Sequence, residues 1–209
     1  MARLPREFYN GDTVEIARAL LGKYLVRRID DEVLVCRITE TEAYVGRCDR
    51  ACHAYGYRRT QRTSVMFGPP GHAYIYFVYG MHHCLNFVTE PEGEPSAVLL
   101  RGAEPIHGLA KICKARFGID DPRLLTPYQR KNLLNGPGKL CKALSLSTIE
   151  NGMDLTSDTL FVCDSPADIG LPVPQLPKHE IIRCGPRIGV DYAGDDKDLP
   201  WRFLLKKGY

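Results

Sequence analysis

Hydrophobic residues recur along the chain with two different periods, and each period predicts one kind of element. Near the N-terminus, apolar residues are spaced at helical intervals between positions 14 and 21. Asp12 followed by Glu15 is the pattern of a capping box, and Gly22 can end a helix. The first predicted element is therefore a helix that begins after Asp12.

Segments rich in β-branched and aromatic residues predict antiparallel strands. KYLVRRI (23–29) and VLVCRITETEAY (33–44) are separated by acidic residues and are expected to form a hairpin. AYIYFVY (73–79), HCLNFVT (83–89) and SAVLLRG (96–102) follow one another closely, which predicts three adjacent strands. Later short strands are expected at TLFVC (159–163), IIRC (181–184) and RFLLK (202–206).

Three helices are expected after the third of these adjacent strands. Pro105 suits the first position of a helix that ends before Gly118. Thr126-Pro127 is the start pattern of a second helix, which Asn135-Gly136 would close, and GPGKLCKALSL (136–146) indicates a third. Strands and helices are thus mixed along the chain.

Composition narrows the class of protein. The 209 residues are 44% hydrophobic, which is enough for a core, and the length suits one domain over residues 1–209. No apolar run approaches the roughly 20 residues that cross a bilayer, and MARLPREFYNGD lacks the apolar region of a signal peptide. We therefore expect a soluble protein whose mature chain begins here and whose eight cysteines stay reduced.

The net charge of +3 does not by itself predict a polyanionic partner. The loop from Val45 to His72, however, concentrates basic side chains before the rigid GPPG segment. These side chains are Arg47, Arg50, Arg58, Arg59 and Arg62. Arg58, Arg59 and Arg62 either contact phosphates or are ordinary solvated side chains of a loop.

Five polar residues in three strand-like segments are candidates for chemistry. A period of two places Glu40, Glu42 and Tyr44 on one face of their strand, which suits acid–base work or a solvated charged face. Arg101 ends an apolar strand, where it would lower the pKa of a nearby carboxylate and help hold a water, or reach solvent. Asn86 lies in an apolar strand and must find partners if it is buried.

The turn Tyr79-Gly80-Met81 carries large side chains where a hairpin usually has small polar ones. Tyr79 either folds back into the core or is exposed at the tip, and a hairpin tip is a poor place to bury a side chain. An exposed aromatic residue on a rigid turn can act as a wedge in stacked bases while arginines meet the phosphates.

Cysteine and histidine residues raise the question of a metal site. Cys48, Cys52 and His53 are zinc-binding types, as are His82, His83 and Cys84, but no second CxxC completes a site. We expect buried reduced thiols and no metal.

Several blocks together resemble the alkyladenine DNA glycosylase family. The matching blocks are ETEAY (40–44), His53, MFGPPGHAYIYFVYGMHHCLN (66–86), AVLLRGAEP (97–105), GPGKLCKAL (136–144) and RIGVDYAG (187–194). Their order and spacing cover nearly the whole chain, apart from residues 145–180. The resemblance implies one compact α+β domain with a curved antiparallel sheet, flanking helices and a β-hairpin that intercalates into DNA.

The resemblance also implies roles for individual residues. Glu42 matches the general base that activates a water to attack C1′ of the deoxyribose, Arg101 matches the arginine that holds this water, and the main-chain carbonyl of Ile188 matches its third partner. Glu40 matches no catalytic residue of the family.

Positions around the base are implied in the same way. Tyr44 and His53 match one side of the pocket that holds the flipped base, and Tyr76 matches the other side. Asn86 matches an asparagine that rejects normal guanine by crowding its amino group. Tyr79 and Met81 match the intercalating tip. Arg58, Arg59 and Arg62 are candidates for contacts to the DNA backbone.

The implied reaction needs one carboxylate, because an alkylated purine such as 3-methyladenine or 7-methylguanine is already cationic and leaves as a neutral base. Hypoxanthine and ethenoadenine are further implied substrates. No lysine nucleophile is implied, so the product is an intact abasic site, and no cofactor is needed. The expected partner is double-stranded DNA that contains damaged purines, and the expected form is a monomer in the cytoplasm, associated with the nucleoid if the source is bacterial.

Two other interpretations stay open. A non-catalytic module that recognises distorted DNA would use the wedge and the arginines without the hydrolysis, but pure binding has no use for a carboxylate such as Glu42 facing DNA phosphate. A zinc-dependent nucleic-acid protein would use Cys48, Cys52 and His53.

Overall fold

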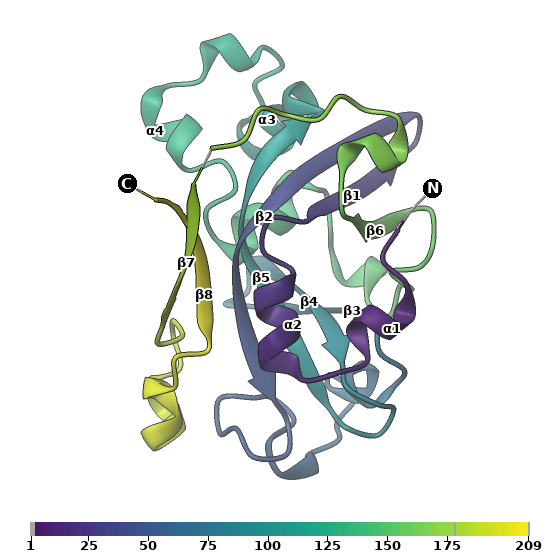
Figure 1. Ribbon diagram of the computed structural model, residues 1–209, viewed down its shortest axis with the longest axis vertical. Coiled ribbons are helices and arrows are strands. Elements are labelled where there is room, and N and C mark those ends of the chain that lie inside the picture. Colours follow the sequence, from purple (N-terminus) through teal and green to yellow (C-terminus); the bar gives the residue numbers. More distant parts are fainter. Residues whose placement is uncertain (1–2, 178, 209) are drawn as a thin grey trace.

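A curled antiparallel sheet forms the centre of the computed structural model, which describes residues 3–177 and 179–208 (Figure 1). Its strand order over these residues is β3-β4-β5-β2-β1-β6, with β8 paired to β2 and β7 paired to β8. The strands are β1 (Tyr24–Ile29), β2 (Glu32–Val45), β3 (Ala73–Val78), β4 (His82–Thr89), β5 (Ser96–His107), β6 (Leu160–Cys163), β7 (Glu180–Gly185) and β8 (Arg202–Lys207). The predicted α+β class with a curved antiparallel sheet is confirmed.

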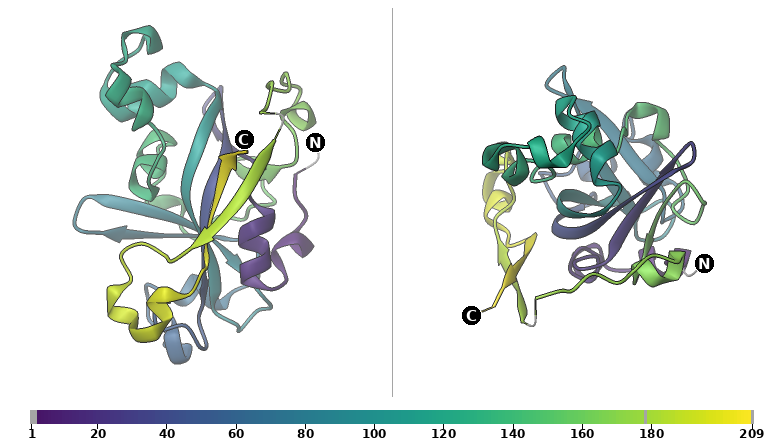
Figure 2. Two further views of the ribbon diagram at one scale, coloured as in Figure 1. Left: turned by 60° about the vertical axis from the view of Figure 1, so that its left-hand side comes forward. Right: turned by 90° about the horizontal axis from the view of Figure 1, so that it is seen from above.

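Helices lie on opposite sides of the central strands, with the N-terminal pair on one side and the later three on the other (Figure 2, left). They are α1 (Arg6–Tyr9), α2 (Thr13–Ala19), α3 (Leu109–Phe117), α4 (Pro127–Lys131) and α5 (Pro137–Ala143). Apolar side chains of both groups join the main core with the sheet. No helix in the described ranges has the length and apolar character needed to cross a membrane.

The helix predicted after Asp12 is α2 and begins where expected, whereas the short helix α1 before it was not predicted. The Asp12 carboxylate accepts hydrogen bonds from the backbone N–H groups of Val14 and Glu15, both at 2.9 Å, and so caps α2. Gly22 follows the helix with a φ of 83°, a conformation that glycine adopts without strain.

The predicted start of the next helix at Pro105 is wrong. Strand β5 continues through Pro105 to His107, and α3 begins at Leu109 after Gly108. Pro105 lies opposite Cys36 beside an irregularity in the β2–β5 pairing, where a missing N–H donor is tolerated. The second of these helices also ends earlier than expected, because α4 stops at Lys131.

Strand β2 pairs with different strands along its length, and this change of partner positions the candidate site. Its first half pairs with β1 as far as Arg37, and β8 then pairs with Glu40–Glu42, while β5 lies along the other edge. Pairing irregularities occur on both sides of Glu40. Because β8 replaces β1 as the pairing partner, the C-terminal segment lies beside the second half of β2. The Glu42 side chain is fully buried in this part of the strand.

Strands β3 and β4 form a hairpin that extends away from the rest of the sheet (Figure 2, left). The two central residues of its turn, Tyr79 and Gly80, have φ values of 53° and 66°, as in a type I′ turn. Helix α5 supports the hairpin closely, because a Cβ atom on Gly138 would lie 2.9 Å from Cγ of His82.

All eight cysteines are free thiols. Six are buried and pack as small apolar residues, namely Cys36, Cys52, Cys84, Cys113, Cys141 and Cys163. Cys48 and Cys184 are exposed.

Candidate active site

A pocket of about 330 Å³ lies beside the β3–β4 hairpin. Its volume is at the small end of the range for small-molecule sites. Eight of the site residues proposed from the sequence line this pocket: Tyr44, His53, Arg62, Tyr76, Tyr79, Asn86, Arg101 and Ile188. Glu42 does not line the pocket itself but contacts three residues that do, Tyr44, Arg101 and Ile188. Met81, Arg58 and Arg59 lie outside the pocket and are exposed.

The Glu42 carboxylate is held from three sides. The Tyr44 hydroxyl donates to Oε2 at 2.7 Å, and the backbone N–H of Ile188 donates to Oε1 at 2.9 Å. Arg101 contributes charge from β5, with Nε 3.3 Å from Oε1 and a long contact of 3.4 Å from Nη1 to Oε2. Burial is the largest influence and raises the pKa of Glu42, although Arg101 and the two donors oppose it. A carboxylate with a raised pKa is a stronger base once it is ionised.

Arg101 also contacts Glu40, at 3.4 Å from Nε to Oε1. Glu40 has a closer partner in Arg202 of β8, whose Nε donates to the same oxygen at 2.6 Å. The two carboxylates therefore share one arginine, but Glu42 is the one that is fully buried beside the pocket.

Ile188 makes a contact that the resemblance does not imply. The resemblance assigns the main-chain carbonyl of Ile188 to the water, whereas the observed contact to Glu42 comes from its backbone N–H. The side chain of Ile188 is 49% exposed and lines the pocket. Ile188 thus holds the carboxylate through its backbone N–H and also lines the pocket.

His53, Tyr74 and Tyr76 form an aromatic wall that Arg62 covers. Arg62 Nη2 donates to Nε2 of His53 at 3.2 Å, so the imidazole is neutral and carries its proton on Nδ1, which lies 3.0 Å from the Tyr74 hydroxyl. The Arg62 guanidinium also lies 4.6 Å from the centre of the Tyr76 ring. His53 and Tyr76 are in edge contact, with ring centres 4.6 Å apart, so a base held between them requires one ring to move.

This environment predicts an unusual titration of His53. Burial, helped by the Arg62 charge, lowers the pKa of His53 from 6.5 to about 4. NMR titration of the imidazole is expected to give a value near 4, and Arg62→Gln should raise it only in part, because burial remains. Between pH 6.5 and 4 the unfolded chain binds the proton and the folded chain does not, so stability falls as pH falls through this window. A value at or above 6.5 would contradict the neutral, arginine-capped imidazole.

Asn86 is 3% exposed and its amide nitrogen is satisfied by backbone. It donates to the carbonyl of Tyr74 at 3.0 Å and to that of Cys84 at 3.3 Å. These bonds fix the side chain at the pocket wall.

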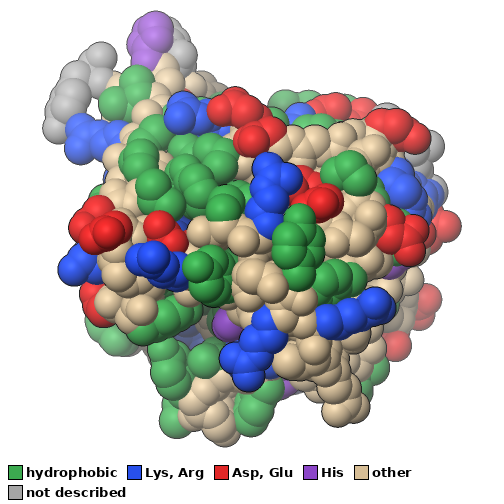
Figure 3. All heavy atoms as spheres, turned by 90° about the horizontal axis from the view of Figure 1, so that it is seen from below, with side chains coloured by type: hydrophobic (Ala, Val, Ile, Leu, Met, Phe, Trp, Pro, Cys, Tyr) green, Lys and Arg blue, Asp and Glu red, His purple; other side chains and the backbone are tan. Residues whose placement is uncertain are grey.

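The hairpin tip and the basic loop lie at the surface. Tyr79 is 81% exposed and Met81 is 69% exposed. Arg59 lies over the Phe67 ring, whereas Arg62 belongs to the pocket wall. Figure 3 shows the loop-bearing end of the molecule, with Lys and Arg side chains scattered among hydrophobic ones and most acidic ones toward the edges.

Two residues at the site were not identified from the sequence. Arg187 and Asp49 form a buried ion pair next to Tyr44, although they are 138 positions apart in the chain. Arg187 begins the block RIGVDYAG, which pointed to this part of the chain but not to the partner. Among the described residues, no three His, Cys, Asp or Glu side chains come together as a possible metal site.

Comparison with known proteins identifies close relatives over almost the full length. The family model described as methylpurine-DNA glycosylase matches residues 7–208. A Bacillus cereus (strain G9842) protein named "Putative 3-methyladenine DNA glycosylase" is 47% identical over 202 residues, which cover 97% of this chain and 95% of the relative. A protein of the same name from Bacillus thuringiensis (strain Al Hakam) has the same identity and coverage.

Proposed function

The chain belongs to the methylpurine-DNA glycosylase family, and from this premise we propose that it excises alkylated purines from duplex DNA with a water that Glu42 activates. As a member of the family it is a DNA N-glycosylase, a hydrolase of base-excision repair. The observation that carries the proposed mechanism is the Glu42 carboxylate, fully buried against Tyr44, Arg101 and Ile188 beneath an aromatic pocket.

In the proposed reaction, a water between Glu42 and the sugar attacks C1′ while Glu42 takes its proton. The bond between C1′ and the purine nitrogen breaks, and its electron pair leaves with the base. A cationic base such as 3-methyladenine or 7-methylguanine becomes neutral on departure, so this step needs no general acid. Arg101 keeps Glu42 ionised by opposing the effect of burial on its pKa.

The proposed product is an intact abasic site. No lysine is among the residues that line the pocket in the described chain, which supports attack by water over attack by an amine. Asn86 is proposed to exclude normal guanine by crowding its amino group, while Tyr44, His53 and Tyr76 stack on the flipped base. Hypoxanthine and ethenoadenine are proposed as further substrates.

Tyr79 is proposed to fill the gap that the flipped nucleotide leaves. Its exposure in the three-residue loop between β3 and β4 supports this role, because the ring can enter the base stack without moving the sheet. Met81 would contact the neighbouring bases, and Arg58 and Arg59 the phosphates. Because one Tyr79 side chain would serve one lesion, the protein is proposed to act as a monomer.

Release of free base under single-turnover conditions tests the function. Four duplexes would each carry one lesion: 3-methyladenine, 7-methylguanine, hypoxanthine or ethenoadenine. We expect base release without added metal and strand breakage only after alkali. Tight binding to every duplex with no base release would instead indicate a module that recognises distorted DNA.

A further inference from the structure

Asp49 and Arg187 form an ion pair that is fully buried next to the candidate site. Both side chains have 0% exposed area, and two parallel contacts join them, at 2.5 Å from Nη1 to Oδ2 and 2.8 Å from Nη2 to Oδ1. Burying two charges is unfavourable unless further hydrogen bonds satisfy both groups. The neighbours of the pair therefore indicate what it holds in place.

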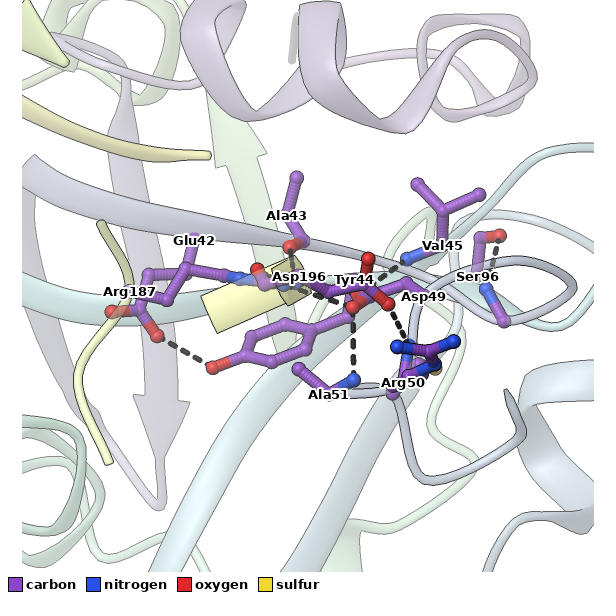
Figure 4. A network of polar contacts seen from close by, with 12 residues as sticks. Glu42, Ala43, Tyr44, Val45, Asp49, Arg50, Ala51, Ser96, Arg187 and Asp196 are labelled. Carbon is purple, nitrogen blue, oxygen red and sulfur yellow. Dashed lines mark hydrogen bonds and ion pairs between the residues drawn. The ribbon is translucent and has the colours of Figure 1, made fainter. Parts of the chain in front are cut away.

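These neighbours come from three separate parts of the chain (Figure 4). Arg187 donates to the carbonyl of Ala43 in β2 at 2.8 Å and to the carbonyl of Asp196 at 3.0 Å. Asp49 accepts from the backbone N–H of Ala51 at 2.9 Å. The pair thus fastens the C-terminal segment and the loop after β2 to the strand that carries Glu42.

The pair is connected to Glu42 by two short routes. The Arg187 guanidinium lies 4.8 Å from the centre of the Tyr44 ring, and the Tyr44 hydroxyl donates to Glu42. Ile188, the next residue after Arg187, donates its backbone N–H to the other carboxylate oxygen. Two of the three groups that donate hydrogen bonds to the carboxylate are thus linked to Arg187: Tyr44 by contact with the guanidinium and Ile188 as the next residue in the chain.

We propose that Arg187, held by Asp49, is a positioning residue that orients the Glu42 carboxylate through Tyr44 and the backbone of Ile188. This inference rests on the proposed role of Glu42 as the general base. It assigns to the buried pair a catalytic purpose in addition to joining segments of the fold. Arg187 itself does not touch the carboxylate through a hydrogen bond in the described contacts.

A positioning role and a purely structural role differ in their effect on the pH profile. The hydrogen bonds from Tyr44 and Ile188 lower the pKa of Glu42 against the effect of burial. If Arg187 is lost and these donors shift, the pKa of Glu42 rises and more of the base is protonated on the acid side. The charged or titratable groups around Glu42 are Glu40 and Tyr44 from β2, Arg101 from β5, Cys84 from β4, Arg202 from β8 and Arg187.

The test compares single-turnover excision of 7-methylguanine by the wild type and Arg187→Gln across the pH range in which both are folded. 7-Methylguanine leaves without being protonated. The acid limb of the profile, where the rate falls as pH falls, therefore reports the protonation of Glu42 alone. We expect the limb of Arg187→Gln to move up by about one pH unit, which is about a tenfold lower rate at a fixed pH on the limb. The rate should approach that of the wild type above the limb, and binding to an abasic analogue should be retained.

Two outcomes would overturn the proposal: an unmoved limb, or the same loss of rate at every pH. The matched control is Arg123→Gln, which breaks the exposed ion pair with Asp121 and should leave the profile unchanged. If Arg187→Gln does not fold, the milder Arg187→Lys is combined with Tyr44→Phe. If the shifts of the acid limb caused by the two substitutions simply add in the double variant, Arg187 does not act through Tyr44.

The same assay separates this inference from the proposed function. Retained excision by Glu42→Gln would remove the role of Glu42, whatever the Arg187 variants do. An inactive Glu42→Gln together with an unmoved limb in the Arg187 variants would overturn the positioning role alone.

Discussion

Glu42→Gln is expected to lower the rate of base release by about 10²- to 10⁴-fold, the range that removal of a general base produces. Glutamine has nearly the same shape as glutamate, but its amide cannot take a proton from water. Single-turnover excision of 7-methylguanine measures the change. Affinity for a duplex with an abasic analogue should stay within a few fold, because the pocket and the hairpin are unchanged.

Stability gives an independent check on this variant. Burial raises the pKa of Glu42, so the folded state binds the proton more tightly than the unfolded state, whose value is near 4.5. The ionised carboxylate therefore opposes folding, and this effect develops as pH rises from 4.5 through the folded pKa. Glutamine removes this effect, so the melting temperature at neutral pH should be retained or raised.

The control for this variant is Glu32→Gln. Glu32 begins the same strand, ten residues before Glu42 and about 30 Å away at the usual rise per residue, and its side chain is exposed. It should leave base release unchanged. Full activity of Glu42→Gln would require another residue to act as the base.

Tyr79→Asn is expected to separate activity from stability. Loss of the aromatic ring should lower excision by about 10- to 100-fold, because stacking of one base on an aromatic ring is worth about 1–3 kcal/mol. The folded protein should nevertheless become more stable, since asparagine suits the left-handed conformation of this turn better than tyrosine does. Single-turnover excision and thermal unfolding of the same preparation measure the two effects.

Tyr128→Asn is the matched control for the hairpin variant. Tyr128 is 74% exposed on α4, away from the pocket, and its loss should change neither property appreciably. If Tyr79→Asn excised bases at the wild-type rate, the gap left by a flipped nucleotide would have to be filled by another group.

Much of the fold follows from local sequence patterns. The alternating segments predicted all the strands of the β3–β4–β5 sheet region, and the capping residue Asp12 predicted the start of α2. Pro105 misled the prediction because its fixed φ suits both a helix start and an irregular strand. Only the pairing with β2, a contact between distant parts of the chain, decides between the two.

The candidate site likewise combines contacts that local sequence patterns predict with contacts that they do not. Glu42 and Tyr44 are two residues apart, so a strand period predicts that they share a face, and their side chains are hydrogen-bonded. The Asp49–Arg187 pair joins residues 138 positions apart, and no local pattern specifies such a contact. The edge contact of His53 with Tyr76 likewise depends on how the loop after β2 folds back over β3.

The burial of most cysteines has a consequence for chemical resistance. Electrophiles that alkylate DNA also attack protein thiols, and they react with the thiolate form. Burial raises the pKa of Cys36 and of Cys52 to about 12, so these sulfur atoms are both shielded and protonated. Cys52 and Cys84 border the pocket and are nevertheless buried. The fold thus shields this repair enzyme from the agents whose damage it removes, with Cys48 and Cys184 as its exposed targets.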